Sequence, residues 1–168
     1  MRRSPIVLLL CLLLLFIGAA CAGTEGTVRM PQPYVTATSG GFSVETLYYL
    51  RWAETWTGEG WLAADGVPVG EDLERSRDLF DRYTLTREGP VTLLFSGEVG
   101  HENPTLRVYD ESYALVDKYQ GDLEAALAAL EPGTWWCSVS VTLEGTYIRS
   151  QQRCERRGYE CLFRLVVE

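Results

Sequence analysis

Residues 134–143 constrain the fold more than any other part of this sequence, because their side chains alternate strictly between two sets. The two sets are Trp135, Cys137, Val139, Val141 and Leu143 against Trp136, Ser138, Ser140 and Thr142. A period of two over this length predicts a β-strand with one buried and one wet face. Residues 159–167 repeat the pattern, with Cys161 and Phe163 on the apolar side and Glu160 and Arg164 on the other.

Shorter strands are predicted at 34–38, 44–52, 91–96, 105–109 and 114–118, separated by turns that contain Gly, Pro, Asn or Asp. Several short strands with such turns favour two packed antiparallel sheets. We therefore predict a mainly β domain, an antiparallel, immunoglobulin-like β-sandwich with one or two short helices.

Two segments interrupt the strands with helical character. Residues 122–130 are rich in Ala and Leu, with Asp122 as the expected N-cap and Pro132-Gly133 as the stop. Residues 71–82 are charged and carry few apolar side chains, so this segment is expected to be a surface helix or an irregular loop.

The N-terminus predicts export across a membrane. Arg2 and Arg3 precede an uncharged apolar run over residues 6–17, which as a helix would reach roughly 18 Å. A hydrocarbon core is about 30 Å thick, so this length is typical of a signal peptide rather than a permanent span.

The residues that follow this run, Gly18-Ala19-Ala20-Cys21, resemble the lipobox of bacterial lipoproteins. The resemblance implies that Cys21 is diacylated and becomes the first residue of the mature chain at the outer face of the cell membrane. Gly18 departs from the pattern, which usually has Leu there. Two alternatives are secretion after cleavage behind Ala22 and an uncleaved anchor.

The expected organisation is a signal peptide over 1–20, a tether rich in Gly, Thr and Pro over 21–33, and one domain over 34–168. Without Arg2 and Arg3, 13 Lys and Arg face 23 Asp and Glu. Such an acidic chain is not expected to bind nucleic acid, nor to hold a membrane through basic residues. The expected membrane contact is the lipid anchor.

Three cysteines remain in the expected mature domain besides the lipidated one: Cys137, Cys154 and Cys161. If residues 155–158 form a hairpin turn, Cys154 and Cys161 lie diagonally on one face and can form a disulfide in an oxidising compartment. The alternatives are a Cys137–Cys161 bond, or three free thiols with Cys137 packed in the core.

A resemblance extends over about 130 residues. The segments 131–136, 144–148 and 48–52 are similar to parts of uncharacterised extracytoplasmic domains of Gram-positive lipoproteins, which also occur beside antirepressor-type membrane metallopeptidases. This resemblance implies a fold and a location but no catalytic residues.

No catalytic constellation or cofactor site is expected. His101, the single histidine, lies in a predicted turn, and no C-x-x-C pair accompanies it, so neither a zinc site nor a His-dependent triad is expected. The acidic residues between 65 and 81 are interleaved with arginines and do not match a calcium loop. Arg156-Arg157 is expected in a solvated turn.

The tryptophans are the candidate binding residues. Trp56 and Trp61 bracket a glycine-containing loop, and Trp136 points away from the apolar face of its strand. Exposed, such rings would bind a protein partner or stack on a sugar; alternatively, Trp136 lies beneath the charged helix or a loop. The expected function is a non-catalytic interaction or sensing module, with an envelope protein as partner. The alternatives are a domain that binds cell-wall glycan and a small hydrolase.

Overall fold

The computed structural model describes residues 35–65, 69–95 and 104–168. The expected signal peptide over 1–20 with its helix, the expected tether over 21–33 with Cys21, and His101 lie outside these residues. Within the described part of the chain, no helix combines the length and the apolar composition needed to span a bilayer.

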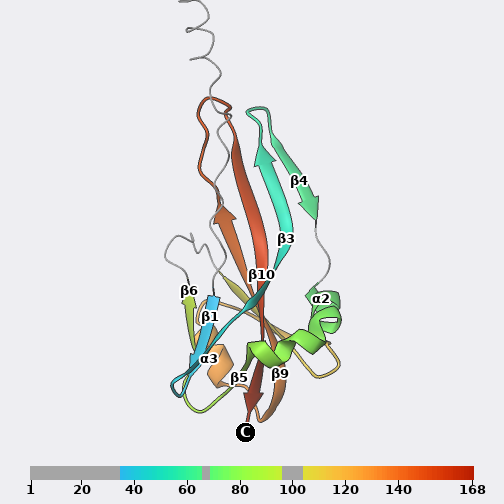
Figure 1. Ribbon diagram of the computed structural model, residues 1–168, viewed down its shortest axis with the longest axis vertical. Coiled ribbons are helices and arrows are strands. Elements are labelled where there is room, and N and C mark those ends of the chain that lie inside the picture. Colours follow the sequence, from blue (N-terminus) through green and yellow to red (C-terminus); the bar gives the residue numbers. More distant parts are fainter. Residues whose placement is uncertain (1–34, 66–68, 96–103) are drawn as a thin grey trace, which may run out of the picture.

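The described chain is mainly β, with open and mostly antiparallel sheets and two short α-helices (Figure 1). The smaller sheet has the order β2-β1-β6, formed by β1 (Val35–Ser39), β2 (Phe42–Glu45) and β6 (Thr92–Phe95). The larger sheet has the order β4-β3-β10-β9-β7-β8, and β5 pairs with the last part of β10 in parallel. Its strands are β3 (Leu47–Trp56), β4 (Trp61–Asp65), β5 (Thr84–Thr86), β7 (Thr105–Tyr109), β8 (Leu115–Gln120), β9 (Gly133–Glu144) and β10 (Cys154–Val167).

The main hydrophobic core lies on one face of the larger sheet. The apolar side chains of β9 and β10 contribute Cys137, Val139, Cys161 and Phe163, as their alternation predicts, and β1, β2 and β6 contribute from the smaller sheet. Helix α3 (Leu123–Ala128) adds Leu123 and Leu127 to the same core. Asp122 is its N-cap, as predicted: the carboxylate accepts from the backbone N of Ala125 at 2.9 Å.

The other face of the larger sheet, which we call the outer face, is covered over part of its length. Helix α2 (Val69–Ser76) continues directly into the 3₁₀ helix η1 (Arg77–Tyr83), so the charged segment is helical throughout. Leu73 and Phe80 are fully buried against this face. At one end of the molecule, β3, β4, β9 and β10 extend beyond both helices and the smaller sheet (Figure 1).

The alternation in the sequence located most strands but not the breaks between consecutive strands. The predicted strand over 44–52 is two strands, because Thr46 turns back to β1 and donates from its backbone N and its hydroxyl to the carbonyl of Val35. Strands β4 and β5 were not predicted. β5 has three residues, too few for a periodic signal.

The predicted Cys154–Cys161 disulfide is wrong. Both cysteines lie on β10, seven residues apart. Because a strand rises about 3.3 Å per residue, about 23 Å separates them. The hairpin turn falls earlier, between Glu144 and Cys154, instead of at residues 155–158. Cys137, Cys154 and Cys161 all lack a disulfide bond, and Cys137 packs in the core, which agrees with the third alternative.

The expectation of a solvated turn at Arg156-Arg157 is also wrong, because the longer β10 carries both residues within the sheet. Arg156 forms ion pairs with Glu54 at 3.8 Å and Glu144 at 3.5 Å on the two flanking strands. Arg157 binds Glu155 at 2.8 Å on the opposite face.

Candidate functional site

The covered end of the outer face holds an aromatic cluster. Trp136 is 6% exposed and packs edge-to-face on Phe80 of η1, with ring centroids 4.7 Å apart. Tyr113 and the guanidinium of Arg164 also contact the indole. Phe80 and Trp136 therefore fix η1 on the sheet, and hydrophobic burial rather than ligand contact accounts for Trp136.

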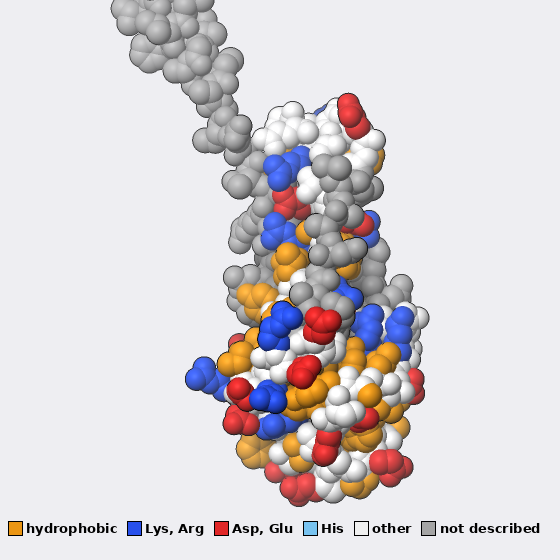
Figure 2. Space-filling model, turned by 90° about the vertical axis from the view of Figure 1, so that its right-hand side faces the viewer, with side chains coloured by type: hydrophobic (Ala, Val, Ile, Leu, Met, Phe, Trp, Pro, Cys, Tyr) orange, Lys and Arg blue, Asp and Glu red, His pale blue; other side chains and the backbone are white. Residues whose placement is uncertain are grey.

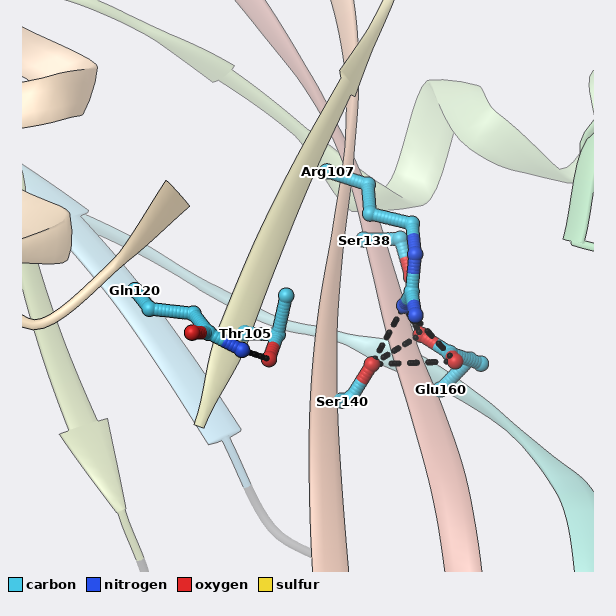
Figure 3. Close-up of polar contacts among 6 residues, drawn as sticks. All are labelled: Thr105, Arg107, Gln120, Ser138, Ser140 and Glu160. Carbon is cyan, nitrogen blue, oxygen red and sulfur yellow. Dashed lines mark hydrogen bonds and ion pairs between the residues drawn. The ribbon is translucent and has the colours of Figure 1, made fainter. Parts of the chain in front are cut away.

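Beyond this cluster, a buried carboxylate organises the polar side chains of three neighbouring strands (Figure 3). Glu160 of β10 is 3% exposed. Ser138 and Ser140 of β9 donate to its Oε2 at 2.5 and 2.9 Å. Arg107 of β7 donates from Nη1 to Glu160 Oε1 at 3.0 Å and to Ser140 Oγ at 2.5 Å.

The strand register explains why these residues meet. Glu160 pairs with Ser140 across β10 and β9, and Ser138 pairs with Arg107 across β9 and β7. Since side chains alternate between the faces, all four point outward from the core. A buried carboxylate needs a counter-charge and hydrogen bonds, and here it has both.

A tryptophan lies flat on the sheet next to this polar network. Trp52 of β3 pairs with Gly158 of β10, where the register of the two strands shifts. A Cβ atom placed on Gly158 would lie within 2.7 Å of three consecutive ring atoms of Trp52: Nε1, Cε2 and Cδ1. Such similar distances require the ring face to cover the glycine, so the absence of a side chain at Gly158 lets the indole lie against the backbone.

Together these side chains line a hollow of about 260 Å³, which we call the outer-face pocket. Its lining residues are Arg51, Trp52, Thr105, Arg107, Ser140, Val141, Thr142, Gly158, Tyr159 and Glu160. The pocket combines two aromatic residues, Trp52 and Tyr159, with several hydroxyl groups, two guanidinium groups and the carboxylate of Glu160. It is smaller than the roughly 300–1,000 Å³ of sites for drug-sized ligands, so it suits a ligand of about one ring.

The electrostatics of the neighbouring groups follow from burial. Burial raises the pKa of Tyr109 to about 12, with a smaller opposing effect of Arg107. Tyr109 therefore stays neutral at physiological pH beside the Arg107–Glu160 pair, and Glu160 supplies the negative charge that balances Arg107. Gln120 of β8 donates to Thr105 at 3.4 Å and holds the rim of the pocket on that side (Figure 3).

A second hollow, of about 570 Å³, is larger but less suited to a specific ligand. It is lined by side chains that project from α2 and η1 into solvent: Glu71, Glu74, Arg75, Arg77 and Asp78. Acidic and basic side chains are interspersed on the helical side of the molecule (Figure 2). A solvated charged face, as the sequence indicates, accounts for this region.

The three predicted binding tryptophans do not form one site. Trp136 is buried under η1, which agrees with the alternative that it lies beneath the charged segment. Trp56 is half-buried at the end of β3, opposite Trp61 in the β3–β4 register. The side chain of Trp61 lies outside the described part of the structure.

Trp52 and Glu160 were not singled out from the sequence. Uninterrupted alternation over the predicted strand 44–52 would put Trp52 on the same face as Tyr48 and Leu50, but the register shift within β3 turns Trp52 to the other face. Glu160 was placed on the wet face of its strand. The one available signal was a glycine at 158 within an otherwise continuous strand, which is typical of close backbone approach.

A comparison with protein families, curated proteins and solved structures found no match.

Proposed function

We propose that this protein is a lipoprotein anchored through Cys21 on the extracytoplasmic side of a cell membrane. We propose that it acts there as a non-catalytic binding or sensing module whose ligand enters the outer-face pocket. The location rests on the short apolar run over 6–17 and on the small residues before Cys21. The segment 21–33 would then serve as the tether between bilayer and domain.

The observation that carries the binding function is a pocket whose polar groups are already held in place. Ser138, Ser140 and Arg107 fix the carboxylate of Glu160, and these bonds also fix the side chains themselves. A site with ordered donors loses little conformational entropy when a ligand binds. The oxygens of Glu160 are occupied by three side chains, which suits a supporting role better than proton transfer to a ligand.

We further propose that the two sheets form an immunoglobulin-like β-sandwich. Support comes from the main core, to which β1, β2 and β6 of the smaller sheet and β7, β9 and β10 of the larger sheet all contribute. In such a scaffold, the part of the outer face that α2 and η1 leave uncovered is one surface available for recognition.

The anchor is tested by intact-mass analysis of the membrane fraction. Removal of residues 1–20 with added acyl mass on Cys21 is the expected result. The variant Cys21→Ala should leave the membrane fraction, whereas Cys154→Ala, a matched cysteine change within the domain, should stay. Wild-type protein that retains its first residues, or a Cys21→Ala protein that remains membrane-bound, would rule out lipidation.

The binding site is tested with the purified full chain in detergent micelles. A set of small polar compounds (glycan fragments, amino acids and dicarboxylates) is screened by NMR of the indole N–H groups. A ligand of the pocket should shift the Trp52 resonance, assigned by its loss in Trp52→Phe, more than the Trp56 resonance. A set of ligands that shifts neither resonance would argue against the site.

A further inference from the structure

The chemistry of the outer-face pocket specifies a class of ligand. We propose that the pocket binds a single pyranose ring of a glycan, stacked on Trp52; this rests on the proposed function, because it assigns the ligand of the same site. The ligand must satisfy three features of the pocket: a flat aromatic wall, a floor rich in hydroxyl and guanidinium groups, and a volume of about 260 Å³.

The aromatic wall selects a ligand with a flat apolar face. Gly158 supports one face of the Trp52 indole, and Trp52 is half-buried and lines the pocket. A ring held against the backbone in this way cannot turn edge-on without losing that contact. The axial C–H groups of a pyranose carry partial positive charge and pack well on the negative face of an indole.

The floor selects hydroxyl groups. Thr105, Ser140 and Thr142 line the pocket. The Ser140 hydroxyl donates to Glu160 and accepts from Arg107, so it offers a ligand only its second lone pair, whereas the hydroxyls of Thr105 and Thr142 can each donate and accept. Arg107 supplies N–H donors, with its side chain 26% exposed. A purely apolar ligand would desolvate these groups without giving them partners, and each group left in that state weakens binding.

The charges of the lining argue against a cationic ligand, although tryptophan faces also attract cations. The lining contains Arg51 and Arg107 against one carboxylate, Glu160, and that carboxylate is already bound to Arg107. A quaternary ammonium or protonated amine would meet guanidinium groups beside the indole. A neutral or acidic sugar meets no such repulsion.

The test uses the full chain in detergent micelles with tetrasaccharides of β-1,4-linked N-acetylglucosamine, β-1,4-linked glucose and α-1,4-linked galacturonic acid. Sorbitol, which has hydroxyl groups but no ring, is the ligand control. Binding is followed by quenching of tryptophan fluorescence and by the NMR shift of the Trp52 indole. At least one tetrasaccharide should bind, and sorbitol should not.

The variant Trp52→Ala should weaken that binding about 30-fold, the factor that corresponds to about 2 kcal/mol for loss of an aromatic anchor. Trp56→Ala, the matched change on the same strand, should stay within about twofold of the wild type, because only Trp52 lines the pocket. If Trp52→Ala does not fold, Thr142→Val removes one floor hydroxyl at nearly constant shape and should weaken binding about fivefold.

Four outcomes overturn the assignment. Tetrasaccharides that do not bind refute the sugar, and binding that survives Trp52→Ala and Thr142→Val unchanged places the sugar elsewhere. If a compound that is not a sugar shifts the Trp52 indole, the sugar is refuted while the binding function stands. If no compound shifts it, both proposals fail.

Discussion

Breaking the Arg107–Glu160 ion pair in the lining of the pocket should destabilise the whole domain. In Arg107→Met, the carboxylate of Glu160, whose side chain is 4% exposed, loses its counter-charge and keeps only the hydroxyls of Ser138 and Ser140. Removing one partner of a fully buried pair costs about 3–5 kcal/mol. Because the Arg107 side chain is 26% exposed, water can partly replace it, and we expect about 3 kcal/mol, the lower end of that range.

The matched control is the double variant Arg107→Met with Glu160→Gln. The Glu160→Gln change removes the buried charge at nearly constant volume, so the double variant should be more stable than Arg107→Met alone, and the two changes should not add. Glu160→Gln alone should cost about 1–2 kcal/mol, since Arg107 remains partly hydrated and hydrogen-bonded to Ser140.

Urea denaturation of all four proteins measures these free energies of unfolding, with an unchanged dependence on urea as the sign of an intact two-state transition. A loss of about 3 kcal/mol should also lower the melting temperature by roughly 10 °C for a domain of this size. An Arg107→Met protein within about 0.5 kcal/mol of the wild type would refute the reasoning, as that is the range of ordinary surface substitutions. Additive single changes would refute it equally.

The remaining predictions concern other parts of the domain. Gly158→Ala should lower the free energy of unfolding by about 1–3 kcal/mol through overpacking and should move the Trp52 indole resonance; an unmoved resonance would contradict the flat stacking. Arg87→Leu should lower the free energy of unfolding by about 1–2 kcal/mol, measured by urea denaturation, because Nη1 of Arg87 donates to three carbonyls at the end of α3, at 3.0–3.2 Å. Arg87→Lys should restore part of this free energy. Burial raises the pKa of Tyr109 from 10.0 to about 12. The stability that the neutral phenol contributes is therefore complete below pH 10 and is lost as the pH rises toward 12. Tyr109→Phe should flatten this decline in a series of melting temperatures measured at increasing pH. Burial likewise raises the pKa of Cys161 to about 12, so iodoacetamide at about pH 8 should label it only after unfolding, as peptide mass mapping would show.

Local sequence patterns were sufficient to predict the β character of the domain and part of its core. Alternation in residues 134–143 and 159–167 assigned Cys137, Val139, Cys161 and Phe163 to one buried face, and all four are in the main core. This worked because a strand projects successive side chains to opposite faces, a local rule that needs no knowledge of neighbours. The N-cap at Asp122 was predictable for the same reason, since its bond spans three residues.

Which polar side chains are buried, and which of them form a site, depends on how the strands pair and pack. Periodicity placed Glu160 correctly on the face opposite the core, but it could not show that Arg107, 53 residues earlier, would neutralise it there. The register shift that brings Trp52 over Gly158 likewise depends on pairing between strands far apart in sequence. Such contacts are set by how whole strands align, and a local pattern determines only the direction of a side chain, not what it meets.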